Sequence, residues 1–427
     1  MKCMELMKNL FTELKFNRIS NKKKVRDSEF NKGEYEYLQY KYSAIIEKLK
    51  KKIKQDKKLK VAFLVDTSSK FASRKLFNLM EKEELFVPYI LVIPTTDGLE
   101  LYNKTYNDLS NQYKNVFKVY DENKNKYTNY LKQTDIAILN TNDQVIYPKM
   151  YRIYNFIKHD ILTCLVYYSY SLLNISNVVN TDVVNLVWKY FVENKDKYNE
   201  ISKIQAIKGK NLVASGYPKM DSLHDEPILK KDKKTVLICS HHTIWSDEYY
   251  SCFLTYCDFF AELPKKYSNI NFIFRPHPLL NNRLKDIWGK EKVEQYWNSI
   301  NSNENAYLDE SAEYLNKFAN SDGIIHDCGS FLAEYLFTGN PQCYLIKNKN
   351  NVSKYYNAIG MDCLENSYLA YKKDDIVDFI ENVIIKNQDV MKKQRADFVS
   401  NVLKYNYPNS SMVVLDYIKN ALTNKLD

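Results

Sequence analysis

Short apolar runs that end in polar residues alternate with amphipathic stretches along most of this 427-residue chain. In the first half, the apolar runs Lys60–Val65, Phe86–Ile93 and Asp135–Leu139 read as strands, and residues 106–113 and 150–157 read as helices. Parallel strands need a long crossover, which is usually a helix, so this alternation predicts a parallel sheet with helices on both faces.

The same pattern restarts in the second half, after the charged segment Asp221–Lys234, which Pro227 interrupts. Four further strands are expected there, at Thr235–Cys239, Ile270–Phe274, Gly323–Ile325 and Gln342–Ile346. A chain of this length exceeds one typical hydrophobic core. The fold class is therefore α/β, with two doubly wound parallel-sheet domains.

These patterns divide the chain into four parts. Residues 1–59 are polar and basic with helical spacing and are expected to form a helical arm, followed by a first sheet domain at 60–222. A second sheet domain is expected at 235–372, and helices without further strands at 373–427. Within the first domain, residues 181–202 read as one long helix.

Composition narrows the function classes. The net charge of +10 and the 36 tyrosines suit a nucleic-acid-binding protein, but many of the basic residues crowd into residues 48–60. That lysine block is either a solvated helix face or a contact for anionic lipid. The uncharged run Ile161–Thr181 carries several serines and asparagines and is expected to be a strand plus loop, not a membrane span.

The amino-terminal residues lack the features of a secretory signal, and the eight cysteines include no CxxC pair. We expect reduced cysteines and a cytoplasmic protein.

Histidines cluster at predicted strand ends in the second half. His241 and His242 follow one strand, His277 follows the next, and His326 follows a third. Ligands of α/β sheets bind outside the carboxyl ends of strands, so these side chains are expected to meet at one site. A zinc site built from them is the alternative, but the chain has no HExxH-like pair.

The residues around these histidines suit a phosphorylated ligand. Arg275 shares a strand with His277, and an arginine beside a histidine can neutralise charge on a leaving phosphate. Asp327, Gly329 and Ser330 open a predicted helix, where free N–H groups favour an anion, and Glu334 lies one turn later, placed to accept a ribose hydroxyl.

Three motifs resemble those of the CDP-glycerol glycerophosphotransferase (teichoic-acid polymerase-like) family. Gly216–Asp221 resembles its Gly-x-Pro-Arg-x-Asp motif, Arg275–Pro278 its (Arg/Lys)-Pro-His-Pro motif, and His326–Ser330 its (Ser/Thr)-Asp-Tyr-Ser-Ser motif. The resemblance covers about Asn211 to Ile346, a third of the chain. It implies a GT-B-like fold, with a Rossmann-like acceptor domain first and a Rossmann-like nucleotide-donor domain second.

The resemblance also implies a reaction: transfer of glycerol phosphate, a related polyol phosphate or a sugar from a nucleotide-activated donor to a capsular, teichoic-acid-like or other surface glycan. It implies that His277 and Ser330 hold the donor's phosphates and that Asp327 shapes the loop. The candidate catalytic residues are His277, His241 and His242. The donor-binding residues would be Ser240, Arg275, His326, Asp327, Gly329, Ser330 and Glu334.

One departure from the family concerns the base. The family's first-domain Trp-His-Gly motif, whose histidine is the presumed base, has no counterpart here, because Leu165–Tyr170 stands at the equivalent place. His241, His242 or His159 would have to replace that base.

Two alternatives remain. The layout also resembles non-hydrolysing UDP-sugar 2-epimerases and UDP-sugar glycosyltransferases of the same fold, and a basic nucleic-acid-binding protein is the alternative of another class.

No metal and no cofactor are expected, since helix N-termini and basic side chains can stabilise a leaving nucleotide. The expected partners are the nucleotide-activated donor and a glycan or lipid-linked acceptor, with peripheral contact to an anionic inner membrane face and no nucleic acid.

Overall fold

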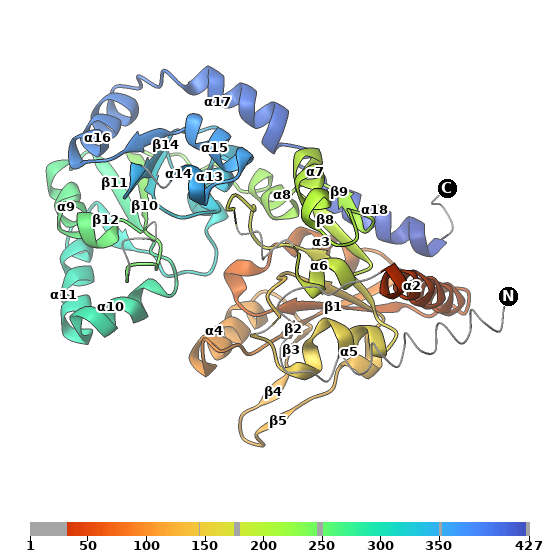
Figure 1. Ribbon diagram of the computed structural model, residues 1–427. Coiled ribbons are helices and arrows are strands. Elements are labelled where there is room, and N and C mark those ends of the chain that lie inside the picture. The colour runs from red at the N-terminus through yellow and green to blue at the C-terminus, as the bar shows by residue number, and fades with distance from the viewer. Residues whose placement is uncertain (1–31, 145, 175–179, 246–250, 350–351, 424–427) are drawn as a thin grey trace. The chain divides into compact units, whose positions relative to one another are not determined.

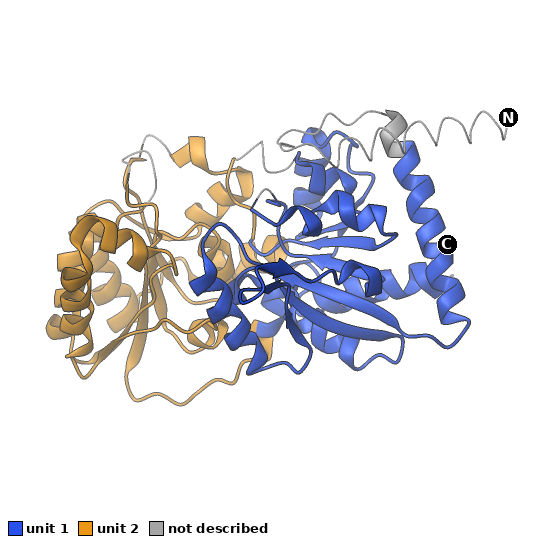
Figure 2. Ribbon diagram, turned by 90° about the horizontal axis from the view of Figure 1, so that it is seen from below, with its two compact units in different colours: residues 1–169, 175–222, 405–427 blue, residues 170–174, 223–404 orange. Residues whose placement is uncertain are grey.

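The computed structural model describes residues 32–144, 146–174, 180–245, 251–349 and 352–423, with side chains from residue 36 onward (Figure 1). The chain divides into two compact units (Figure 2). Unit 1 comprises Met1–Ser169, Ile175–Ser222 and Tyr405–Asp427, and unit 2 comprises Tyr170–Asn174 and Leu223–Lys404.

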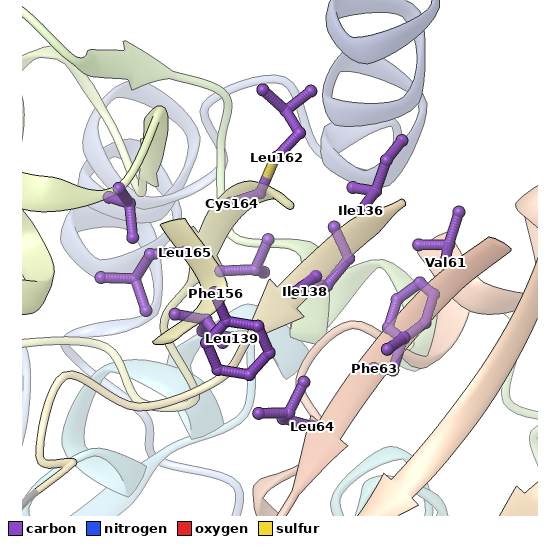
Figure 3. Close-up of a cluster of buried hydrophobic side chains, with 14 of the residues drawn as sticks. Val61, Phe63, Leu64, Ile136, Ile138, Leu139, Phe156, Leu162, Cys164 and Leu165 are labelled. Atoms are coloured by element: carbon purple, nitrogen blue, oxygen red, sulfur yellow. The ribbon is translucent and has the colours of Figure 1, made fainter. Parts of the chain in front are cut away.

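Unit 1 is built on a seven-stranded parallel sheet, with the strand order β3-β2-β1-β6-β7-β8-β9. The strands are β1 (Leu59–Val65), β2 (Phe86–Val92), β3 (Val116–Lys118), β6 (Ile136–Leu139), β7 (Leu162–Val166), β8 (Lys189–Val192) and β9 (Leu212–Ala214). The central strands are buried almost without interruption, as expected for a parallel sheet covered on both faces. Their side chains form the core seen in Figure 3, where Phe63, Ile138 and Leu165 are labelled.

Helices of unit 1 are α2 (Lys32–Ile53), α3 (Arg74–Glu81), α4 (Leu99–Ser110), α5 (Ile153–Lys158), α6 (Asp182–Leu186), α7 (Lys195–Ile204), α8 (Pro218–His224, which ends in unit 2) and α18 (Ser410–Thr423). A small hairpin, β4 (Tyr120–Asp121) and β5 (Lys126–Tyr127), stands apart from the sheet. The predicted arm falls partly on residues 1–31, which lie outside the described residues. Its described part, α2, belongs to the core of unit 1: the Tyr42 hydroxyl donates to the Leu186 carbonyl at 2.6 Å and bonds the Thr163 hydroxyl at 2.7 Å.

The single long helix expected at 181–202 is wrong. The segment contains α6, strand β8 and α7 in succession. Tyr190–Val192 is a fully buried apolar run of strand-forming residues that pairs with β7 and β9, and this pairing overrides the helical spacing. Asn194 then starts α7, because its side chain accepts the backbone N–H of Lys197 at 2.8 Å.

Unit 2 is built on a six-stranded parallel sheet, with the order β12-β11-β10-β13-β14-β15. The strands are β10 (Lys234–Cys239), β11 (Ile270–Phe274), β12 (Ala306–Leu308), β13 (Gly323–His326), β14 (Gln342–Leu345) and β15 (Tyr368–Ala370). The helices that connect them include α9 (Phe253–Lys266), α10 (Leu280–Trp288), α11 (Lys290–Asn301), α12 (Leu315–Ala319), α13 (Phe331–Glu334) and α15 (Ala358–Glu365).

The carboxy-terminal residues are helical, as predicted, but they belong to both units. Helices α16 (Lys373–Asp378) and α17 (Lys392–Phe398) are part of unit 2, whereas α18 contacts α2 and α3 of unit 1. The motif Gly216–Asp221 explains this attachment of α18. The Asp221 carboxylate accepts the backbone N–H groups of Ser410 and Ser411, at 3.2 and 2.6 Å, and so caps the first turn of α18.

Two further expectations concern the cysteines and the membrane. The seven cysteines that the structure describes are buried and form no disulfide with one another. Among the described residues, no helix has both the length and the apolar character needed to cross a bilayer. The uncharged run Ile161–Thr181 contains strand β7 followed by a loop, as predicted, although residues 175–179 lie outside the described residues.

Candidate functional site

The strand order of unit 2 defines where a ligand can bind. From β10 the chain moves outward to β11 and β12, and from β13 it moves outward in the opposite direction to β14 and β15. Between β10 and β13 the two connections diverge, and ligands of open α/β sheets bind at the carboxyl ends of such a strand pair. Cys239 pairs with His326 at that end, so Ser240–His242 and Asp327–Ser330 leave the sheet side by side.

Asp327 joins these two loops. Its carboxylate accepts the backbone N–H of His241 at 2.6 Å and the backbone N–H of Cys252 at 2.5 Å. The Ser251 hydroxyl donates to the His241 carbonyl at 2.9 Å on the same loop. Burial raises the pKa of Asp327 to about 7, against the effect of its hydrogen-bond donors. Asp327 therefore fixes the backbone that carries His241.

Three histidines come together beside this junction. The ring centroids of His242 and His277 are 4.2 Å apart. The ring centroid of His241 lies 4.3 Å from that of His242 and 5.0 Å from that of His277. His277 reaches this place because its backbone N–H donates to the Ser240 carbonyl at 2.9 Å, which ties the end of β11 to the end of β10. Burial, and secondarily the neighbouring His242, lowers the pKa of His241 to about 3, so this imidazole is neutral at physiological pH.

The hydrogen bonds of these rings indicate which ligand they suit. Their ligand atoms lie within 4.8 Å of one another, a spacing that could hold a transition metal after small ring movements. Nδ1 of His277 accepts the backbone N–H of Leu279 at 3.1 Å. Nδ1 of His241 lies 3.1 Å from the Thr243 hydroxyl and 3.4 Å from the Thr243 backbone N, so either tautomer of His241 has a partner there. A neutral ring whose Nδ1 accepts carries its proton on Nε2, which is then a donor. Such a donor on His277 suits an anion, and the spacing of the three rings suits a metal ion.

Trp245 extends this cluster and was not among the residues singled out from the sequence. Its ring centroid is 5.6 Å from that of His242, the Arg283 guanidinium lies 5.3 Å from its centroid, and half of its surface is exposed. An exposed tryptophan beside a histidine pair is a platform on which a flat ring can stack. The sequence could have pointed to Trp245, because it stands three residues after His242.

Arg275 has a structural ion pair. Its guanidinium donates from Nη1 to Asp309 at 2.5 Å and from Nη2 to the Ser311 carbonyl at 2.7 Å, and it lies over the Tyr314 ring. Burial works to raise the pKa of Asp309, but hydrogen bonds from Ser311 and the charge of Arg275 hold it below its ordinary value. These contacts fasten the end of β11 to the end of β12, and a role of Arg275 in phosphate binding stays a prediction.

His326 and Glu334 lie deeper than the loops. His326 is fully buried on β13, where its Nε2 bonds the Gln342 side chain at 3.0 Å, and burial lowers its pKa to about 4. Glu334 is also fully buried and accepts the Tyr314 hydroxyl at 2.5 Å. A direct contact of either residue with a donor stays a prediction.

Ser240, Gly329 and Ser330 lie at the strand ends themselves. The Ser240 side chain is buried, whereas Gly329 and Ser330 are half-buried where the chain enters α13. His159, the other base considered from the sequence, lies just before the amino end of β7 in unit 1, at the edge of the sheet opposite the strand ends that form ligand sites.

Comparisons with known proteins agree with this architecture. No protein-family model and no curated protein sequence matches the chain. Among solved structures, the wall teichoic acid polymerase TagF superposes with a TM-score of 0.58 at 13% identity, covering 91% of this chain and 99% of that one. A UDP-N-acetylglucosamine 2-epimerase superposes with a TM-score of 0.55 at 12% identity, covering 87% and 98%. The S. aureus MnaA–UDP co-structure gives 0.54 at 14% identity, covering 85% and 97%.

These likenesses, at identities below 15%, concern the fold. They agree with the two sheets, each parallel and each with the doubly wound strand order. The chain therefore has the GT-B fold, an α/β architecture of two Rossmann-like units, as the sequence motifs predicted.

Proposed function

We propose that the chain is a transferase that moves glycerol phosphate, or a related polyol phosphate or sugar, from a nucleotide-activated donor to a surface glycan acceptor. One observation carries the proposal. At the switch point of unit 2, the ends of β10, β11 and β13 bring together His241, His242 and His277 beside the loop Asp327–Ser330. This is the part of an open α/β sheet where nucleotides bind.

The chemistry of these residues suits the diphosphate of a donor. A neutral His277 ring whose Nδ1 accepts a backbone N–H carries its proton on Nε2 and can donate to a phosphate oxygen, and the half-buried Ser330 hydroxyl follows the end of β13. Charge that develops on the departing phosphate would be stabilised by these fixed donors. Trp245 would stack on the base.

The polyol-phosphate assignment draws on the family motifs together with the fold shared with TagF, a wall teichoic acid polymerase. A UDP-sugar enzyme is the second candidate, because a UDP-N-acetylglucosamine 2-epimerase shares the fold over a similar part of the chain. In either case the donor would occupy unit 2. The acceptor would be a glycan or lipid-linked glycan at the inner membrane face, and no metal or cofactor would be needed.

Calorimetric titration of the full chain tests this proposal, with CDP-glycerol, CDP, UDP and UDP-N-acetylglucosamine as ligands. We expect the cytidine compounds to bind and His277→Ala to weaken their binding at least tenfold, about 1.4 kcal/mol. His159→Ala is the matched control and should bind as the wild type does, since His159 lies at the opposite sheet edge of unit 1. Uridine preference would favour the second candidate, and failure of all four ligands would refute the proposal.

A further inference from the structure

Three of the six histidines of the chain form one cluster in unit 2, the histidine trio of His241, His242 and His277. One ligand atom from each ring lies within 4.8 Å of the other two. Nitrogen ligands at about 2.0–2.1 Å from a tetrahedral zinc ion are about 3.4 Å apart, so the largest separation in the trio must close by about 1.4 Å. Small rotations of the rings supply this movement, because all three side chains are half-buried and reach the surface.

The loops that carry the trio are fastened to one another through their backbones. The His277 N–H donates to the Ser240 carbonyl at 2.9 Å, and the His241 N–H donates to the Asp327 carboxylate at 2.6 Å. Adjacent residues of a strand point to opposite faces, but His241 and His242 lie beyond the end of β10, and their ring centroids are 4.3 Å apart. The three rings are therefore gathered before any ligand arrives, which lowers the entropy cost of binding an ion.

The hydrogen bonds of the trio are compatible with metal ligation. The Thr243 hydroxyl lies 3.1 Å from His241 Nδ1 and can accept a proton from it, which leaves the Nε2 lone pair for a metal. His277 must change its tautomer, because its Nδ1 accepts the Leu279 N–H at 3.1 Å. Ligation through Nε2 moves the ring proton to Nδ1 and releases that N–H. The loss is one hydrogen bond at a half-buried loop residue, which is small beside the free energy of several metal–nitrogen bonds.

The donor atoms of the trio select the kind of ion. Imidazole nitrogens suit zinc, copper and nickel, whereas magnesium and calcium prefer oxygen ligands. The Asp327 carboxylate does not supply a further ligand, because its two oxygens accept the backbone N–H groups of His241 and Cys252. Three protein nitrogens leave the fourth position of a tetrahedral ion open to water or a bound ligand.

We propose that the histidine trio binds one divalent ion of the late first transition series, zinc foremost, through three neutral imidazole nitrogens. This inference goes beyond the function proposed above and does not rest on it, since that transfer needs no metal. The two uses of His277 exclude each other, because an Nε2 atom that ligates an ion carries no proton to donate to a phosphate.

Calorimetric titration of the full chain tests the site, with a protein that carries no histidine tag and has been freed of metal by a chelator. The probes are ZnCl₂, CoCl₂ and MgCl₂. We expect one tight zinc ion per chain, visible ligand-field absorption with cobalt, and no magnesium binding. His241→Ala, His242→Ala and His277→Ala should each weaken zinc binding at least tenfold. His159→Ala is the matched control and should bind zinc as the wild type does, because His159 is also a half-buried histidine but lies in unit 1.

Three results would overturn the inference: no zinc binding by the wild type at about 100-fold molar excess, unchanged zinc affinity in the trio variants, or equal weakening by His159→Ala. Thermal unfolding of each variant in the presence of a chelator shows whether weakened binding reflects lost folding, and three separate variants keep the test valid if one of them misfolds. Nucleotide titration of the wild type with a chelator present separates this inference from the proposed function. Zinc binding without nucleotide binding would refute the proposed function alone, and nucleotide binding without zinc binding would refute this inference alone.

Discussion

Replacing Asp327 by asparagine removes one of two hydrogen bonds that hold the loops of the unit 2 site. The carboxylate accepts from the backbone of His241 with one oxygen and from the backbone of Cys252 with the other. An asparagine has a single oxygen, so its amide NH₂ would face one of these N–H donors, and a buried donor would lose its acceptor. The expected loss in the free energy of unfolding is about 2–4 kcal/mol, for a charge-assisted hydrogen bond and one unsatisfied buried group.

Asp322→Asn is the matched control, because Asp322 lies at the other end of the strand pair formed by β10 and β13. Asp322 precedes β13, and its Oδ2 alone accepts both the Thr235 backbone N–H at 2.8 Å and Lys231 at 2.6 Å. The single oxygen of an asparagine can keep both contacts, and the Asp322 side chain is partly exposed. The expected loss in the free energy of unfolding is therefore about 1 kcal/mol or less.

The assay is guanidinium unfolding of both variants at pH 8, where a carboxyl with a pKa of about 7 is ionised, followed by nucleotide titration. We expect Asp327→Asn alone to weaken nucleotide binding, at least tenfold, because only it releases the backbone of His241. Equal stability losses in the two variants, or unchanged nucleotide affinity in Asp327→Asn, would refute the reasoning.

Two further predictions concern stability. Gly216 has φ of +95°, and a Cβ there would meet the Ser410 hydroxyl oxygen at 2.3 Å, whereas a Cβ on Gly98, with φ of +103°, would meet nothing within 4 Å. Replacing either glycine by alanine strains the backbone by about 1–2 kcal/mol. In urea unfolding, Gly216→Ala should lower the free energy of unfolding by at least about 1 kcal/mol more than Gly98→Ala does. Equal losses in the two variants would contradict the packing of α18. Burial lowers the pKa of His326 from 6.5 to about 4, so the unfolded chain binds more protons between these values, and stability is lost as pH falls through that window. Wild type should therefore lose about 2 kcal/mol more than His326→Gln between pH 7 and pH 5 in guanidinium unfolding, and an equal pH dependence would contradict a buried neutral His326.

The sequence was sufficient for most of the central strands, with β8 as the exception, and for only some of the edge strands. Strands β1, β2, β10 and β11 were predicted nearly residue for residue, because each is a mostly apolar run bounded by turn residues. The edge strands β12 and β15 were missed, because three residues carry too little pattern to distinguish them from a loop.

Other differences arise from tertiary contacts. Helix α2 looked like a separate arm because its charged face dominates its composition, yet Tyr42 reaches into the core of unit 1. Strand-end placement brought His241, His242 and His277 together as expected, since neighbouring parallel strands end at the same edge. The ion pair of Arg275 with Asp309 joins residues 34 positions apart, and nothing in the local sequence predicts it.

Hydrogen exchange of the full chain with and without saturating CDP-glycerol, and separately UDP, tests most directly the claim that the switch point of unit 2 holds the donor. The account predicts slower exchange in the peptides that cover residues 239–245, 275–280 and 326–333, with the strands of unit 1 unaffected. Protection that falls only on unit 1, or no protection by either nucleotide, would contradict it.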